Sequence, residues 1–171
     1  VTAARPSDRP GVVVGPCLAA RVFRRSFLTS EVMSAQAARP EPDELFLVRA
    51  FSAARAIDVA AGPMFFRRQP ENPAGFAPLT WALAASAGLD LLASAGHATA
   101  RGRFAEHLLT ELRSHLTALP AAVTELAPAY SALVRSALAA LPPGSLARLP
   151  VRARWQLAIL ALGQLRLLPL L

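Results

Sequence analysis

The sequence contains no lysine, so all 18 of its basic residues are arginine; with 11 acidic residues, they give the 171-residue chain a formal net charge of +7. Charge is scarce overall, because only 17% of the residues are charged whereas 54% are hydrophobic. A chain with so little polar surface is expected to be buried in a larger assembly or in lipid. Arginine binds phosphate and carboxylate through paired hydrogen bonds, so this charge suits RNA or an anionic lipid surface.

Acidic residues are missing from the C-terminal part of the chain. Residues 131–171 contain five arginines and no acid, and residues 1–70 contain ten arginines and six acids. Residues 71–130 have the opposite balance, with three arginines and five acids. The two ends of the chain are therefore the candidate anion-binding regions.

Signatures of catalysis are also missing. The single cysteine, Cys17, excludes an internal disulfide framework and a cysteine-rich zinc site, and no histidine stands near it in the sequence. No serine occupies a nucleophile elbow. A phosphate-binding loop follows a strand, but no strand is predicted before the glycines around His97 in "SAGHATARG". We therefore expect a protein that is not an enzyme and that holds no cofactor.

One histidine pattern could bind a metal. His107, Glu111 and His115 follow one another at a spacing of four, so a helix places them on one face, as a zinc site would require. The same spacing is ordinary for a surface pair of Glu and His, and Glu106 and Arg113 indicate that this helix has a solvated face. We expect a surface pair and no metal.

Residues 1–16 form a proline- and glycine-rich arm around "VVV" that allows one short strand. After residue 16, strand patterning is almost absent. Beyond it, apolar stripes at helical spacing alternate with proline and glycine. They predict six helices, at about residues 18–39, 42–61, 76–88, 101–119, 124–141 and 151–168. We expect an all-α fold, an antiparallel helical array of which a short α-solenoid is one form, with a basic N-terminal extension over residues 1–40 and a helical domain over 41–171.

Some helix ends can be predicted in more detail. The second helix begins at Pro42 among acidic residues and ends at Gly62-Pro63. Gly88 is either the end of the third helix or a point of close packing, and Asp90 caps a short turn after it. Thr124 is the expected N-cap of the fifth helix.

The closing stretch "RARWQLAILALGQLRLLPLL" raises the question of a membrane anchor. A spanning helix needs roughly 20 predominantly apolar residues, but only Trp155 to Leu165 lies uncharged between Arg154 and Arg166. We expect instead a helix buried on most of its faces. A chain that ends in such a helix is not expected to be stable as a free monomer.

The segment "RVFRRSFLTS", residues 21–30, is rich in arginine and free of acids. Mitochondrial targeting segments have this composition, and a basic surface arm is the alternative. A second arginine pair, Arg67 and Arg68, follows two phenylalanines in a predicted loop. Such a loop could hold a nucleic-acid backbone and stack on a base, or could place its phenylalanines in the core and its arginines in water.

Three of the predicted helices share a texture of leucine, a central Trp or Tyr, and small residues. They are "FAPLTWALAASAGL" (76–89), "TELAPAYSALVRSAL" (124–138) and "ARWQLAILALGQL" (153–165). This texture resembles the first helix of organellar helical repeats of the heptatricopeptide and octotricopeptide kinds, which often accompany RAP-type domains. The resemblance implies an α-solenoid that binds RNA or is built into an organellar ribosome, and its last helix would need a following repeat or a partner.

Two functions fit these patterns. The first is a structural protein of an organellar ribonucleoprotein, with the mitochondrial ribosome as first choice, that contacts rRNA phosphates and neighbouring proteins. The arginines expected to contact RNA are Arg21, Arg24, Arg25, Arg67, Arg68, Arg148, Arg152 and Arg154. The alternative is an accessory subunit of a mitochondrial inner-membrane respiratory or ATP-synthase complex, with the arginines at the lipid surface.

Overall fold

The computed structural model describes residues 3–14, 22–28, 43–58, 78–118 and 123–164. Within these ranges nearly all regular structure is helical, which confirms the predicted all-α class. The α-helices are α1 (Arg25–Phe27), α2 (Asp43–Ala53), α3 (Pro78–Ser94), α4 (Ala98–Ala118), α5 (Val123–Ala140) and α6 (Val151–Ala161). Three short 3-10 helices, η1 (Pro6–Asp8), η2 (Pro10–Val14) and η5 (Leu146–Arg148), and two two-residue strands, β1 (Ala3–Ala4) and β2 (Ile57–Asp58), complete the described elements.

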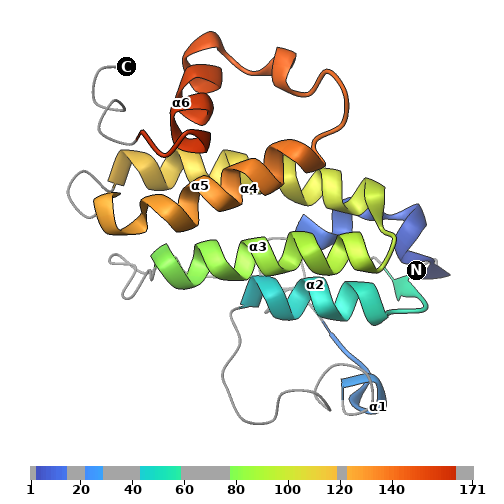
Figure 1. Cartoon of the computed structure of the whole chain (residues 1–171). Helices are drawn as coiled ribbons and strands as arrows, with labels where there is room; N and C mark the ends of the chain where they lie inside the picture. Colours follow the sequence, from blue (N-terminus) through green and yellow to red (C-terminus); the bar gives the residue numbers. More distant parts are fainter. Residues whose placement is uncertain (1–2, 15–21, 29–42, 59–77, 119–122, 165–171) are drawn as a thin grey trace.

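The helices stack with α3 near the centre, in contact with α2, α4 and α5, while α6 rests on α5 (Figure 1). Helices α3, α4 and α5 alternate in direction, as predicted, but α2 runs in the same direction as α3 (Figure 1). A ring contact near the ends of both helices agrees with this, since Phe51 of α2 lies 5.6 Å from His97, just after α3.

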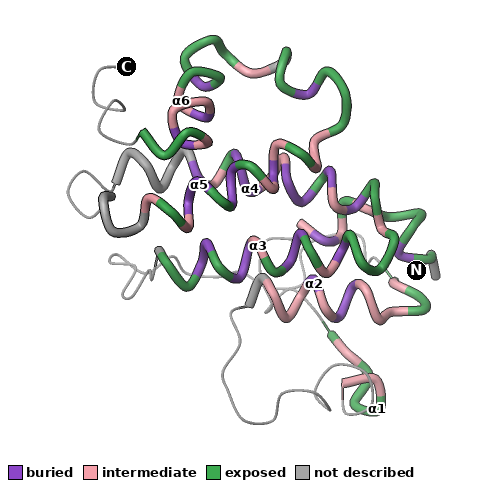
Figure 2. Tube along the Cα trace, viewed as in Figure 1, coloured by how far each residue is buried: buried purple, intermediate pink, exposed green. Residues whose placement is uncertain are grey.

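A single apolar core joins these elements. Buried positions recur along α3, α4 and α5 (Figure 2), because leucine and alanine there repeat at helical spacing. The largest fully buried side chains are Val48, Leu89, Leu92, Leu108, Leu112, Leu133, Val134, Leu157 and Leu160. Val48 of α2 is completely buried.

The N-terminal segment belongs to this core. The "VVV" sequence lies in η2 rather than in a strand, since Pro10 begins a 3-10 turn there. Val13 is buried, and η2 packs against α4 and α2. In the helix predicted over residues 18–39, the described residues 22–28 are helical only at α1, and the remainder lies outside the described residues.

Gly88 is a packing point and not the end of a helix. Helix α3 continues through it, and a Cβ atom placed there would lie 2.8 Å from Cε1 of Phe104 and 3.4 Å from Cγ2 of Val48. The missing side chain therefore lets α4 and α2 approach α3 at the same place. Asp90 is an exposed residue inside α3 and caps nothing, which corrects the turn predicted there.

The helix ends are set by backbone hydrogen bonds that the apolar pattern does not reveal. After α3, Gly96 adopts φ 73°, and the N–H groups of Gly96 and His97 donate to the carbonyls of Ala93 and Leu92. The fifth helix begins at Val123, so Thr124 lies inside its first turn rather than before it.

Two helices are shorter than predicted. Helix α2 ends at Ala53 instead of Gly62, because Ile57 and Asp58 pair with Ala4 and Ala3 as antiparallel strands. Helix α6 ends at Ala161 instead of Leu168. Gly163, at φ 70°, ends it by turning the backbone so that the next N–H groups donate to the last turn of the helix.

Tyr130, the only tyrosine, is buried in α5 with its ring centroid 6.2 Å from that of Trp81. Its hydroxyl has no hydrogen-bond partner in the described part of the chain. Burial raises the pKa of Tyr130 to about 12 from an ordinary value of 10.0. The neutral phenol is therefore the form that the fold accommodates.

We predict that replacing Gly88 by leucine lowers the free energy of unfolding by about 3 kcal/mol, because the new side chain collides with the ring of Phe104. Ala87→Leu, at the exposed neighbouring position of α3, is the matched control and should change it by less than about 0.5 kcal/mol. Urea unfolding measures both. Adding Phe104→Ala to Gly88→Leu should cost less than the sum of the two single changes. Equal effects at positions 87 and 88 would contradict this packing.

We predict that the stability of the protein falls as the pH rises above about 10, the ordinary pKa of tyrosine. The folded state holds the Tyr130 proton up to about pH 12, so between these values the unfolded state binds fewer protons and is favoured by rising pH. The chain has no lysine that titrates in this range, and Tyr130→Phe should abolish the fall. Phenolate absorbance of the folded protein should appear only near pH 12; its appearance at pH 10 would refute the prediction.

Candidate functional site

The structure describes some of the predicted RNA-binding arginines and not others. The structure describes the side chains of Arg24, Arg25, Arg152 and Arg154, and all four are exposed. Arg21, Arg67 and Arg68 lie outside the described residues, and the side chain of Arg148, in η5, is likewise not described.

The described arginines form two groups that lie far apart. Arg24 and Arg25 are at α1, which is held to α2 by a perpendicular contact between the rings of Phe23 and Phe46, whose centroids are 5.7 Å apart. Arg152 and Arg154 are on α6, at the opposite end of the helical stack (Figure 1). The structure therefore does not join the described arginines into one continuous basic surface.

Helix α6 is held to α5 by apolar contacts and one hydrogen bond. Ala153, Leu157 and Leu160, spaced by four and three residues, are buried on one face. The hydroxyl of Ser131 in α5 donates to the carbonyl of Ala161, at 2.9 Å, in the last turn of α6. This bond satisfies a carbonyl that the helix itself leaves unpaired, and it fixes the C-terminal end of α6.

The opposite side of α6 is apolar as well. Val151, Trp155 and Leu162 are 59%, 60% and 73% exposed, and their spacing places them on one line along the helix, facing away from the buried residues. Arg152 and Arg154 lie on either side of this line and are also exposed. We call Val151, Arg152, Arg154, Trp155 and Leu162 the outer face of α6. The expectation that this helix is buried on most of its faces is therefore wrong for the chain on its own.

The sequence predicts the arginines of the outer face, but it does not predict that Val151, Trp155 and Leu162 face outward beside them. Three large apolar residues at positions 151, 155 and 162 already form a stripe in the sequence. A second apolar stripe, at positions 153, 157 and 160, lies on the other side of the helix, so the sequence does not show which of the two is exposed.

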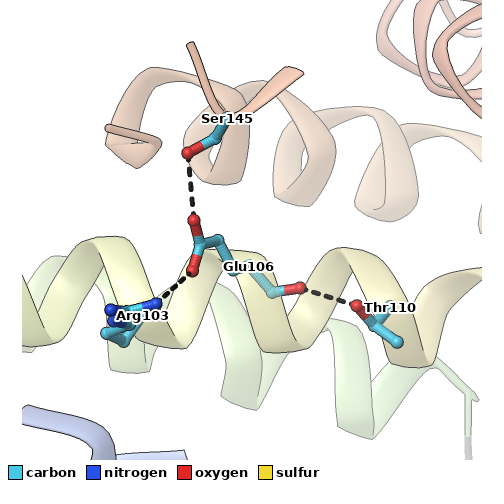
Figure 3. A network of polar contacts seen from close by, with 4 residues as sticks. All are labelled: Arg103, Glu106, Thr110 and Ser145. Atoms are coloured by element: carbon cyan, nitrogen blue, oxygen red, sulfur yellow. Dashed lines mark hydrogen bonds and ion pairs between the residues drawn. The ribbon is translucent and has the colours of Figure 1, made fainter. Parts of the chain in front are cut away.

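Glu106 anchors the connection between α5 and α6. One oxygen of its carboxylate accepts a hydrogen bond from the hydroxyl of Ser145, at 2.9 Å, and the other lies 3.2 Å from a guanidinium nitrogen of Arg103 (Figure 3). Thr110 donates to the backbone carbonyl of Glu106 on the same helix. Ser145 lies 39 residues away from Glu106 in the sequence, so this bond ties α4 to the segment that leads into α6.

A close backbone approach supports the same connection. A Cβ atom at Gly102 of α4 would lie 3.2 Å from Cδ of Pro142, which follows α5. Beyond it, Gly144 turns the chain with φ 81°. The "PPG" sequence therefore ends α5, as predicted, and directs Ser145 towards Glu106.

The described histidines of the remaining candidate groups make surface and packing contacts. Nε2 of His107 lies 3.2 Å from Oε1 of Glu111 on the surface of α4, as expected for a pair one turn apart; the side chain of His115 is not among those described. His97 packs against Phe51, and Cys17 lies outside the described residues. In the described part of the chain, no cluster of three or more His, Cys, Asp or Glu could hold a metal ion.

No described helix has both the length and the apolar content needed to cross a membrane. No family model, curated protein or solved structure matches this chain.

We predict that Ser145→Ala lowers the free energy of unfolding by about 1 kcal/mol, because it removes a hydrogen bond to a charged group at a nearly buried position. A double-mutant cycle with Glu106→Ala should give a coupling energy of about 1 kcal/mol. The matched cycle of Arg103 with Glu106 should give less than about 0.5 kcal/mol, since the Arg103 side chain is 59% exposed. A larger coupling for Arg103 than for Ser145 would contradict the anchoring role of Ser145.

Proposed function

We propose that this chain is a non-catalytic, structural helical protein of an organellar ribonucleoprotein, with the mitochondrial ribosome as the first choice. In this proposal its exposed arginines contact rRNA phosphates, and its apolar surface contacts neighbouring proteins. Mitochondrial localisation is part of the proposal; it is supported by the acid-free, arginine-rich composition of residues 21–30 and by the resemblance to organellar helical repeats.

The observation that carries the proposal is that described arginines at the two ends of the stack are exposed and are not paired with a described carboxylate. Arg24, Arg152 and Arg154 are exposed, and within the described residues none of them forms an ion pair with a carboxylate. An exposed guanidinium without a carboxylate partner can bind a phosphate and break no internal ion pair in doing so. Because the two groups lie apart, the chain would contact RNA at two places, as a scaffold protein does, rather than read a sequence in one groove.

A second function is favoured by the apolar residues of the outer face of α6. Aliphatic side chains such as Val151 and Leu162 gain nothing from a phosphate backbone, but they gain free energy when a membrane subunit or lipid covers them. This observation supports an accessory subunit of an inner-membrane respiratory or ATP-synthase complex. Sedimentation with ribosomal particles in detergent would favour the first function, and migration with a respiratory or ATP-synthase complex would favour the second.

We predict that replacing Arg148, Arg152 and Arg154 together by glutamine weakens the salt dependence of RNA binding. Each arginine that binds a phosphate releases counterions, so the slope of log K against log salt should become shallower by roughly 0.7 to 0.9 for each such arginine replaced. Filter binding or fluorescence anisotropy across a salt series measures the slope, and circular dichroism should show unchanged helix content.

Arg103→Gln is the control for this series: it removes one positive charge from α4, where the carboxylate of Glu106 neutralises it locally, and it should leave the slope nearly unchanged. A triple variant that binds RNA with the parental slope would show that the arginines near α6 do not contact phosphate. The ribonucleoprotein proposal would then be without its main support.

A further inference from the structure

The outer face of α6 is apolar at its centre and cationic along its sides. Trp155 lies between Val151 and Leu162 on the line that faces away from α5, and Arg152 and Arg154 lie on the two flanks. In a helix exposed to water, this central line is normally polar. Two apolar faces on one helix therefore indicate that something other than water covers the outer one.

Every charged side chain of α6 and of the segment that leads into it is an arginine. No acidic residue occurs anywhere in residues 131–171, which include the second half of α5, the connection and all of α6. The occupant of the face must therefore be anionic where it meets Arg152 and Arg154, and apolar where it meets Trp155. RNA meets the first requirement but offers no apolar surface to Val151 and Leu162.

The shape of the face narrows the choice further. Helix α6 packs on α5 at the edge of the stack (Figure 1), and the exposed side of a helix, which is a cylinder, forms a convex ridge. A folded protein would need a matching groove lined with carboxylates, whereas the interface of a bilayer adapts to any convex apolar ridge. Tryptophan is enriched at this interface, and the long arginine side chains can reach lipid phosphates while their stems stay among the acyl chains.

We propose that the outer face of α6 binds the surface of an anionic lipid bilayer. Trp155, Val151 and Leu162 enter the boundary between headgroups and acyl chains, and Arg152 and Arg154 contact lipid phosphates. An 11-residue helix is about 16 Å long, roughly half the hydrocarbon thickness, so it lies along the bilayer plane. This inference rests on the second of the two proposed functions, whose lipid contact it names, and at Arg152 and Arg154 it is the alternative to the RNA contact of the first.

The tryptophans provide a direct test. The chain has two, and Trp81 is buried whereas Trp155 is exposed. The full chain is mixed with vesicles of phosphatidylcholine alone or of phosphatidylcholine with phosphatidylglycerol. The fluorescence emission should shift to shorter wavelength with the anionic vesicles, and the protein should float with them in a density gradient. Trp155→Phe should keep the flotation and abolish the shift, because only Trp81 then emits.

Variants test the apolar ridge separately from the charge. Val151→Ser combined with Trp155→Ser should weaken vesicle binding at least about tenfold. Leu83→Ser on α3, where leucine is 57% exposed on another helix, is the matched control and should leave binding unchanged. Arg152→Gln and Arg154→Gln should each weaken binding to anionic vesicles about fivefold. Arg24→Gln removes the same charge at the α1 end and should have a smaller effect.

Three results would overturn the proposal. The first is the absence of a Trp155 emission shift with anionic vesicles. The second is an equal loss of binding in Leu83→Ser and in the double serine variant, which would indicate non-specific adsorption. The third is an absence of vesicle binding together with a change of oligomeric state in the double serine variant, which would assign the face to self-association. The double serine variant keeps every arginine, so its RNA salt slope should not change, and a failure of this inference is distinguishable from a failure of the RNA proposal.

Discussion

The close contact between α3 and α4 at Gly88 determines how the other helices are placed. The ring of Phe104 occupies the space that a side chain at position 88 would need, and Val48 of α2 approaches the same point. Because α3 also packs against α5, one missing side chain sets the distance between the central helix and its neighbours. Protein cores tolerate little extra volume, so a side chain at position 88 would force Phe104 or the helices to move.

Helix α6 is attached in a different way. Apart from its three buried apolar residues, its position depends on polar anchors: Ser131 on its last turn, and the bond between Ser145 and Glu106 before its first. Hydrogen bonds of this kind contribute about 1 kcal/mol each, but they have direction. They fix the rotation of α6 about its own axis, and that rotation decides which apolar stripe faces α5 and which faces outward.

The sequence predicted the helical fold well because helix formation depends on local patterns. The stripes over α4 and α5 and the break at "PPG" are visible in neighbouring residues alone. The errors occur where distant segments decide the outcome. Ile57 leaves the helical pattern because Ala4 is available to pair with it, and Gly88 does not end α3 because Phe104 packs over it. Neither partner can be recognised from the residues that surround the misassigned position.

In the candidate site, too, some features can be predicted from the sequence alone and others depend on distant contacts. Its arginines were found by composition, which needs no structure, and four of the eight are described and exposed. The outer face of α6 was missed because its identity depends on which of two apolar stripes packs against α5. The hydrophobic pattern alone does not say which stripe packs against α5, whereas the Ser131 bond and the path of the chain through Ser145 favour the observed orientation.

The two arginine groups have different apolar neighbours, and this difference bears on what each can bind. Near α1, the rings of Phe23 and Phe27 stack on each other with centroids 6.4 Å apart, and Phe23 also packs on Phe46. These rings contact one another, so the arginines beside them can offer phosphate contacts more readily than base stacking. On α6, Val151, Trp155 and Leu162 are instead largely exposed. Arginines beside exposed aliphatic residues suit an occupant that is anionic and apolar at once. Lipid has both properties and RNA has one, so the surroundings of each arginine, rather than its charge, separate the two proposed contacts.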